Sequence, residues 1–127
     1  MDLGIRGKRA LVIGGSQGLG YAVSERLATE GVNLLVFARN AERLAQCREK
    51  LQAEHGIRVD TCAGDITSEQ DVDRLSRDAA SGGGVQILVL NSPRPPSPMR
   101  DFLEETEQAR WDEAYQQQLH GALLVLR

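Results

Sequence analysis

The sequence predicts an α/β protein built on a doubly wound parallel sheet. Short apolar runs alternate with amphipathic helical patterns along the chain, and helices that connect strands in this way make right-handed crossovers in a parallel sheet. The first apolar run ends in glycines at positions 14, 18 and 20, spaced Gly-x-x-x-Gly-x-Gly, directly before a helical pattern. We expect one domain over residues 1–127, with the strand order 3-2-1-4.

The first three elements follow from apolar spacing. Residues 10–13 predict a strand that ends at the glycines, and residues 18–30 predict a helix that ends at Gly31, a residue type common just after a helix. The inward face of this helix is expected to carry Leu19, Val23 and Leu27. Residues 33–37 predict a second strand, and its unbroken apolar run indicates burial on both faces.

The middle of the chain predicts a helix, an edge strand and another helix. Asn40 can cap a helix that runs to about residue 54. Its inward positions are expected to be Ala41, Leu44, Ala45 and Leu51. The alternating residues 57–63 indicate an edge strand. Thr67 and Gln70 are expected to form a capping box that opens the third helix. Its inward side carries Val72, Leu75 and Ala79.

The last part of the chain predicts a turn, a strand, a loop and a helix. Glycines at 82–84 precede a fourth strand over residues 85–90, and all four prolines fall in a loop over residues 92–98. A final helix is expected from about residue 107 to Arg127, where no capping signal follows. The fourth strand would be an exposed apolar edge. We therefore expect an incomplete sheet, the N-terminal part of a longer one-domain protein.

Composition excludes several function classes. The net charge of −3 provides no basic surface for nucleic acid, and no apolar run approaches the roughly 20 residues that span a bilayer. The N-terminus lacks the apolar core of a signal peptide. We expect a cytoplasmic protein without nucleic-acid or membrane partners, in which Cys47 and Cys62 are free thiols.

The glycine motif predicts a nucleotide-binding turn. Residues without side chains let backbone N–H groups approach a phosphate, and the helix N-terminus adds a favourable potential. A strand before and a helix after such a turn are typical of the pyrophosphate site in Rossmann-type folds; the alternative is a purely structural turn. Gly14, Gly18 and Gly20 are expected to serve the turn, the backbone approach and the helix–strand packing. Ser16 and Gln17 are placed to reach phosphate or ribose oxygens.

The end of the second strand favours NADP over NAD. An acidic residue at this position would bind the ribose 2′-hydroxyl and repel a 2′-phosphate, whereas Ala38 offers no carboxylate. Arg39 offers a fixed charge and a planar fork suited to phosphate. The alternative is a solvated arginine at a helix start, and the position of Arg39 at the strand-to-helix switch favours the phosphate.

In order along its whole length, the chain resembles the N-terminal half of a short-chain dehydrogenase/reductase. The glycines match the cofactor turn of that family, with Leu19 inside it, and Ala38-Arg39 resembles its NADP-preferring members. Gly64-Asp65-Ile66-Thr67 resembles the Asp-hydrophobic pair after the third strand. This resemblance implies that Asp65 accepts a hydrogen bond from the adenine amino group, with the Ile66 backbone alongside; the alternative for Asp65 is a turn residue before the helix.

Further matches lie toward the C-terminus. Residues 87–91 resemble the strand that ends in the Asn-Asn-Ala-Gly of the family, which implies a cofactor contact for Asn91. Trp111-Asp112, followed by residues 119–122, resembles the next long helix. That helix commonly packs against its counterpart in a second subunit, and here its apolar residues cover more than one stripe. The expectation is a homodimer or homotetramer; the alternative is that further residues of the same chain cover this side.

The chain departs from the family pattern at sites near the chemistry. Ile13 replaces a usual threonine, and Ser92-Pro93 replaces Ala-Gly, so the loop beside the nicotinamide ribose must be rebuilt. Gln118 stands where the family has an asparagine that helps hold a water in the proton relay.

No catalytic residue is identifiable in the sequence. The family's Tyr-x-x-x-Lys is missing, because Glu25 and Leu119 stand four residues after the two tyrosines. His55 and His120 lack metal-ligand spacing, so we expect no metal site and a solvated His55 at a helix end. Glu104, Glu105 and Glu107 are expected to be solvated surface rather than an acid/base pair.

The resemblance implies the cofactor-binding half of an NADP-dependent oxidoreductase. The complete enzyme would transfer a hydride between the nicotinamide and the carbonyl or alcohol carbon of a small molecule. NAD is the less favoured cofactor, and the substrate pocket of the family comes largely from later segments. The alternative function is a non-catalytic nucleotide-binding or regulatory relative that has lost the chemistry, a reading that Pro93 and Gln118 support.

Overall fold

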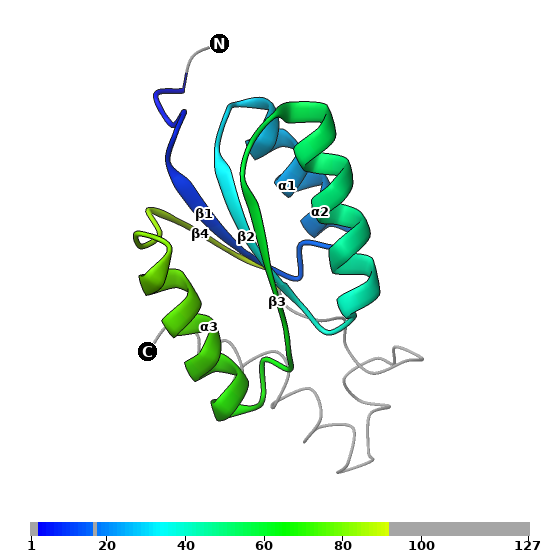
Figure 1. Cartoon of the computed structure of the whole chain (residues 1–127), viewed down its shortest axis with the longest axis vertical. Coiled ribbons are helices and arrows are strands. Elements are labelled where there is room, and N and C mark those ends of the chain that lie inside the picture. The colour runs from blue at the N-terminus through cyan, green and yellow to red at the C-terminus, as the bar shows by residue number, and fades with distance from the viewer. Residues whose placement is uncertain (1–2, 17, 92–127) are drawn as a thin grey trace, which may run out of the picture.

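The computed structural model of the chain describes residues 3–16 and 18–91, in which strands and helices alternate (Figure 1). In chain order they are β1 (Arg9–Ile13), α1 (Gly18–Thr29), β2 (Asn33–Ala38), α2 (Ala41–His55), β3 (Val59–Ala63), α3 (Glu69–Ser81) and β4 (Ile87–Leu90). The predicted α/β class is confirmed. Strand β3 begins at residue 59 rather than 57, and β4 at 87 rather than 85.

The sheet has the predicted order, β3-β2-β1-β4, and each neighbouring pair of strands is parallel. Ile13 lies opposite both Phe37 and Leu90, and Ala38 lies opposite Ala63. All four strands therefore finish at the same side of the sheet, which we call the carboxyl edge. The side where Arg9, Asn33, Val59 and Ile87 begin the strands is the amino edge.

Helices cover both faces of the sheet, with α1 and α2 on one and α3 on the other (Figure 1). Alternate residues of β1 and β2 enter the two cores, so Val36 packs toward α1 and α2 while Phe37 packs toward Leu75 of α3. The expected burial of the second strand on both faces is confirmed, since positions 34–37 are at most 2% exposed.

The predicted inward face of α1 was right only in part: Val23 and Leu27 are half-buried, and Leu27 packs against the core. The buried residues are Gly20, Ser24 and Ala28, whereas Leu19 is 73% exposed. Small side chains let the helix lie close to the end of β1. The buried Ser24 hydroxyl donates a hydrogen bond to the Gly20 carbonyl at 2.9 Å. Apolar periodicity favoured the large residues and did not detect a face made of small ones.

Helix α2 begins as predicted. The Asn40 side chain accepts hydrogen bonds from the backbone N–H groups of Glu42 and Arg43 at 3.0 and 3.1 Å. The buried residues are Leu44, Cys47 and Leu51. The expectation that Ala41 and Ala45 face inward was wrong: both are exposed, because the buried stripe of the helix runs through Leu44, Cys47 and Leu51 instead.

The capping box of α3 was also assigned to the wrong residues. Ser68 is the N-cap and accepts from the backbone N–H of Asp71 at 3.3 Å. Thr67 instead donates its hydroxyl to Asp65 at 2.7 Å, and Gln70 is a first-turn residue without the expected reciprocal bond to it. Of the three predicted inward residues of α3, Leu75 is buried and the two others are half-buried.

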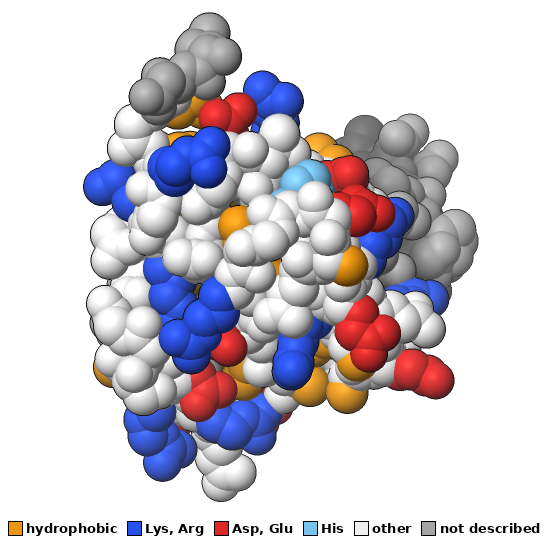
Figure 2. Space-filling view, turned by 45° about the horizontal axis from the view of Figure 1, so that its top comes forward, with side chains coloured by type: hydrophobic (Ala, Val, Ile, Leu, Met, Phe, Trp, Pro, Cys, Tyr) orange, Lys and Arg blue, Asp and Glu red, His pale blue; other side chains and the backbone are white. Residues whose placement is uncertain are grey.

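Basic and acidic side chains are interspersed on the face that Figure 2 draws, rather than gathered into a patch of one sign. Among the described residues, no helix is long and apolar enough to cross a membrane. Both cysteines are buried free thiols, as expected. The predictions of a proline loop, a final helix, an acidic surface and an oligomer interface fall on residues outside the described ones, as do Gln17, Gln118 and His120.

Candidate functional site

The carboxyl edge brings together the segments that follow all four strands. The Gly14 amide donates to the Phe37 carbonyl at 2.7 Å, and the Gly64 amide donates to the Ala38 carbonyl at 2.9 Å. The Asn91 amide donates to the carbonyl of Ile13 at 3.2 Å. The strand ladder thus extends one residue beyond its strands and fixes the starts of the loops that carry the predicted site residues.

The three motif glycines have three different environments. Gly14 has a φ of +77°, and a Cβ there would lie 2.9 Å from the Asn91 carbonyl oxygen. A Cβ on Gly20 would overlap the carbonyl oxygen of Gly14, which explains the close packing of α1 against the end of β1. Gly18 has a φ of +58°, and apart from its chain neighbours and the backbone of its own helix no described atom lies within 4 Å of its Cβ position. Gly18 therefore combines a backbone that L residues rarely adopt with open space beside it.

Gly15 belongs to the turn and was missed by the sequence reasoning. It is buried, and a Cβ there would lie 2.8 Å from both the Ser24 hydroxyl and a Val12 methyl group. Its carbonyl accepts from Ser24 at 3.4 Å and from the Cys47 thiol at 4.0 Å. Side chains of α1 and α2 thus hold the turn in place through the Gly15 carbonyl. The only signal in the sequence was the Gly14-Gly15 doublet.

The N-terminus of α1 is open to an anion. Gly18, Leu19 and Gly20 are its first three residues, and the first amides of a helix have no acceptor within it. No acidic residue lies in this first turn, so no carboxylate of the helix itself neutralises the positive potential that the helix dipole places there. Ser16 is half-buried just before it, and the exposed Leu19 lies beside the amides.

Arg39 and Ala38 lie where β2 ends. Ala38 is the last residue of the strand and Arg39 is exposed. Among the described residues, no carboxylate forms an ion pair with the Arg39 guanidinium, although its charge contributes to lowering the pKa of Asp65. This arginine is therefore available to a phosphate.

Asp65 performs the turn role that was the alternative to ligand binding. Its Oδ1 atom accepts from the amide and the hydroxyl of Thr67, at 2.9 and 2.7 Å. These two bonds are the main reason that the pKa of Asp65 is lowered; desolvation acts against them and Arg39 assists them. Within the described residues no donor bonds Oδ2. The turn role therefore leaves one carboxylate oxygen for a ligand.

Ile66 and Asn91 complete the set of predicted residues that the structure describes. The Ile66 side chain is 4% exposed and packs in the α3 core, so only its backbone can face a ligand. The Asn91 side chain is half-buried and its Nδ2 lies 3.5 Å from the Gly14 carbonyl, which ties β4 to the glycine turn. The ligand contacts themselves remain predictions.

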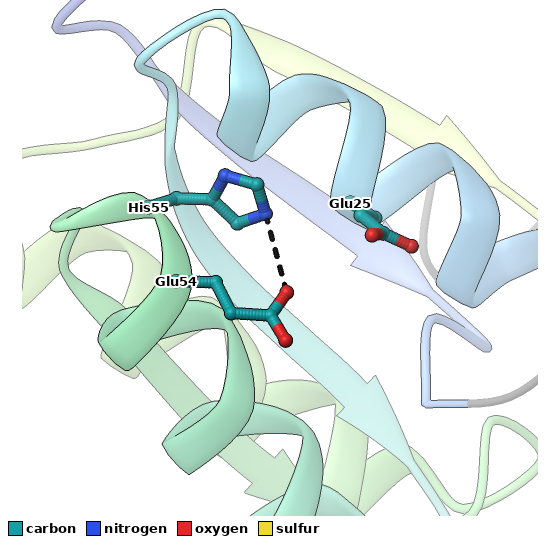
Figure 3. Close-up of side chains that lie close together, drawn as sticks. All are labelled: Glu25, Glu54 and His55. Atoms are coloured by element: carbon teal, nitrogen blue, oxygen red, sulfur yellow. Dashed lines mark ion pairs between the residues drawn. The ribbon is translucent and has the colours of Figure 1, made fainter.

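A second group of polar side chains lies between α1 and α2 (Figure 3). Possible ligand atoms of Glu25, Glu54 and His55 lie within 4.8 Å of one another. The prediction of a solvated His55 was wrong: its side chain is 19% exposed, and Nε2 lies 3.8 Å from a Glu54 oxygen. Glu25 comes from the neighbouring helix, so metal-ligand spacing within the sequence could not reveal this contact.

This α1–α2 cluster has its own cation. Tyr21, then Glu54 and Glu25, raise the pKa of the Lys50 ammonium, which lies 5.5 Å from the centre of the Tyr21 ring. His55 is the last residue of α2, a helix that begins at the carboxyl edge. His55 thus lies at the end of α2 away from that edge, and the cluster already contains a positive charge near its carboxylates.

Comparison with known proteins gives one consistent result. The model of the family described as short chain dehydrogenase matches residues 8–127. Glucose 1-dehydrogenase from Gluconobacter oxydans (strain 621H) is 39% identical over 104 residues, which are 80% of this chain and 39% of that protein. Cis-2,3-dihydrobiphenyl-2,3-diol dehydrogenase from Paraburkholderia xenovorans (strain LB400) is 32% identical over 97% of this chain and 44% of its own length.

Solved structures agree. The crystal structure of L-sorbose reductase from Gluconobacter frateurii, complexed with NADPH and L-sorbose, superposes with a TM-score of 0.90 at 30% identity. The match covers 100% of this chain and 48% of the chain of the reductase. The actinorhodin polyketide ketoreductase with NADPH gives a TM-score of 0.82 at 28% identity, over 94% of this chain and 44% of its own. The chain thus spans less than half the length of these four proteins.

Proposed function

Because the chain belongs to the short-chain dehydrogenase family, we propose that it binds NADP(H) for hydride transfer to or from a carbonyl or alcohol carbon. The observation that carries the NADP preference is the exposed Arg39 guanidinium after a β2 end in which Ala38 replaces a carboxylate. Similarity to two proteins solved with NADPH supports it. The proposed substrate is a small molecule.

The glycines provide the close turn and the open space that the proposed cofactor requires. Gly14 and Gly20 leave no space for a Cβ, so the strand end and the helix start lie as close as backbones allow. The space beside Gly18 and the free amides of α1 suit a pyrophosphate. We assign Arg39 to the 2′-phosphate and Asp65 to the adenine, with Ile66 and Asn91 lining the ribose and base. When bound, the cofactor supplies or accepts the hydride.

Titration of NADPH and NADH tests this assignment. Arg39→Ala removes a charge-assisted contact worth roughly 1.5–3 kcal/mol, so NADPH affinity is expected to fall about 10- to 150-fold, with NADH affinity nearly unchanged. Arg48→Ala is the matched control, because it removes an exposed arginine of α2 that the site does not use. Equal losses for both cofactors would remove Arg39 from this role.

A turnover assay separates the enzyme from the non-catalytic alternative. The 127 residues contain no Tyr-x-x-x-Lys to move the proton, so we expect this chain to bind NADPH without oxidising it in the presence of small carbonyl compounds. Turnover by the purified chain would contradict this expectation. The enzyme is supported over the regulatory relative by two results together: the 127-residue chain binds NADPH without turnover, and a longer polypeptide that contains this chain and a Tyr-x-x-x-Lys turns it over.

A further inference from the structure

The segment between β3 and α3 is tied to α3 by two charged side chains. The backbone amide of Asp65 donates to Asp71 Oδ2 at 2.9 Å. Asp71 Oδ1 lies 3.4 Å from Arg74 Nη2, and the same nitrogen donates to the Ala63 carbonyl. One member of this ion pair therefore binds an N–H of the segment, while the other binds a C=O two residues earlier.

The space around Gly64 shows how closely α3 packs on this segment. A Cβ on Gly64 would lie 2.9 Å from Asp71 Cβ, 3.0 Å from a ring carbon of Phe37 and 3.1 Å from Arg74 Nη2. The segment is thus confined between the sheet and the first two turns of α3. Any residue larger than glycine would push the two charged side chains away.

Asp71 does not have the usual role of an acidic residue at its position. It is the third residue of α3 after the Ser68 cap, where an acidic side chain commonly accepts from the amide of the capping residue itself. Here the Ser68 amide donates to the Asp65 carbonyl at 3.0 Å, and the Asp71 carboxylate extends past the cap to the Asp65 amide. The carboxylate thus holds the loop rather than the helix end.

We propose that Asp71 and Arg74 are a positioning pair that sets Asp65 for the adenine amino group. The inference rests on the proposed function, because it needs adenine at this loop. Asp71 fixes the backbone of Asp65, and Thr67 fixes its Oδ1 atom. The carboxylate is therefore held in one orientation, and Oδ2 is the oxygen that remains for the adenine amino group. The pair acts through Asp65 and does not touch the cofactor.

The test compares NADPH with its hypoxanthine analogue, in which an oxo group replaces the adenine amino group. The wild type is expected to bind NADPH roughly tenfold more tightly, since the analogue lacks the exocyclic amino donor and presents an oxo acceptor to the Asp65 carboxylate instead. Asp71→Ala and Arg74→Gln should reduce this preference to about twofold, while Arg74→Lys, which keeps the charge, restores part of it. Asp73→Ala is the matched control, because it removes an exposed carboxylate from the same helix.

The ratio of the two affinities distinguishes positioning from simple stabilisation. A variant that is merely less stable binds both cofactors less well and keeps the tenfold preference, which would overturn the proposal. If Asp71→Ala does not fold, Arg74→Gln, at a side chain 49% exposed, decides in the same way. A wild type that binds neither cofactor would contradict the proposed function itself. A wild type that binds both equally would overturn only the role of Asp65 and its positioning pair.

Discussion

Two arginines at opposite edges of the sheet, Arg9 and Arg39, use their charges in opposite ways. At the amino edge, Arg9 donates to the Ala79 carbonyl at 2.9 Å and pairs with Asp60 at 3.1 Å. Arg58 pairs with the same carboxylate at 3.2 Å. At the carboxyl edge, Arg39 is exposed and forms no ion pair within the described residues.

Backbone groups follow the same division. The amino edge closes its loops with side-chain amides: the Arg9 amide donates to Gln86 Oε1 at 2.8 Å, and the Val59 amide donates to Gln52 at 3.2 Å. The carboxyl edge leaves open space beside Gly18 and at the start of α1. Groups that bind one another stabilise the fold, whereas groups that remain open are available to a ligand.

The largest effect on binding is expected from Gly18→Val. The side chain would fill the open space that the pyrophosphate needs, and its β-branch disfavours a φ of +58°. We expect NADPH affinity to fall more than about 100-fold, with a loss of roughly 1–2 kcal/mol in the free energy of unfolding. Calorimetric titration and urea denaturation measure the two quantities. Normal NADPH binding by a folded Gly18→Val protein would make the turn purely structural.

A substitution at the amino edge should lower the stability of the fold and leave NADPH binding unchanged. Arg9→Met removes a guanidinium that is 11% exposed, together with its bonds to Asp60 and to the Ala79 carbonyl, which keeps the Gly84 amide as a donor. A loss of about 2 kcal/mol in unfolding free energy is expected, with NADPH affinity unchanged. Arg58→Met is the control, since its side chain is 67% exposed and surface pairs contribute less than about 1 kcal/mol. The contrast between the two edges is lost if Arg9→Met weakens NADPH binding more than it weakens the fold.

The smallest effect concerns pH. The folded protein lowers the pKa of Asp65 from its usual 3.8, so the charged carboxylate stabilises the loop. This contribution is complete above about pH 5 and disappears as the pH falls through the lower pKa of the folded state. The stability difference between wild type and Asp65→Asn should therefore be constant from neutral pH to about pH 5, and shrink below pH 4. A difference that grows on acidification has the wrong sign for this account.

The sequence predicted those features that depend on local pattern. The Asn40 cap depends on one side chain and the amides next to it. The strand order follows because few topologies connect alternating strands and helices by right-handed crossovers. The separate roles of Gly14 and Gly20 were predictable because the motif itself encodes the spacing of a tight turn before a helix.

Features that depend on contacts between distant segments could not be predicted. The inward face of α1 consists of small residues because Gly20 meets the carbonyl of Gly14, and hydrophobic periodicity carries no such information. Gly15 needs to be glycine because of Ser24 and Val12 around it. The bond from the Asp65 amide to Asp71 depends on how α3 packs against β3, which no spacing in the sequence reveals.

Backbone amide chemical shifts in isotope-labelled protein, followed during NADPH titration, test the division between the two edges most directly. The largest changes are expected at residues 14–16 and 18–20, at Arg39 and at Asp65, all of which lie at the carboxyl edge. Amides of the amino edge, such as those of Arg9, Arg58 and Gly83, should keep their positions. Changes centred on the amino edge, or no saturable change at the glycine turn, would contradict the account.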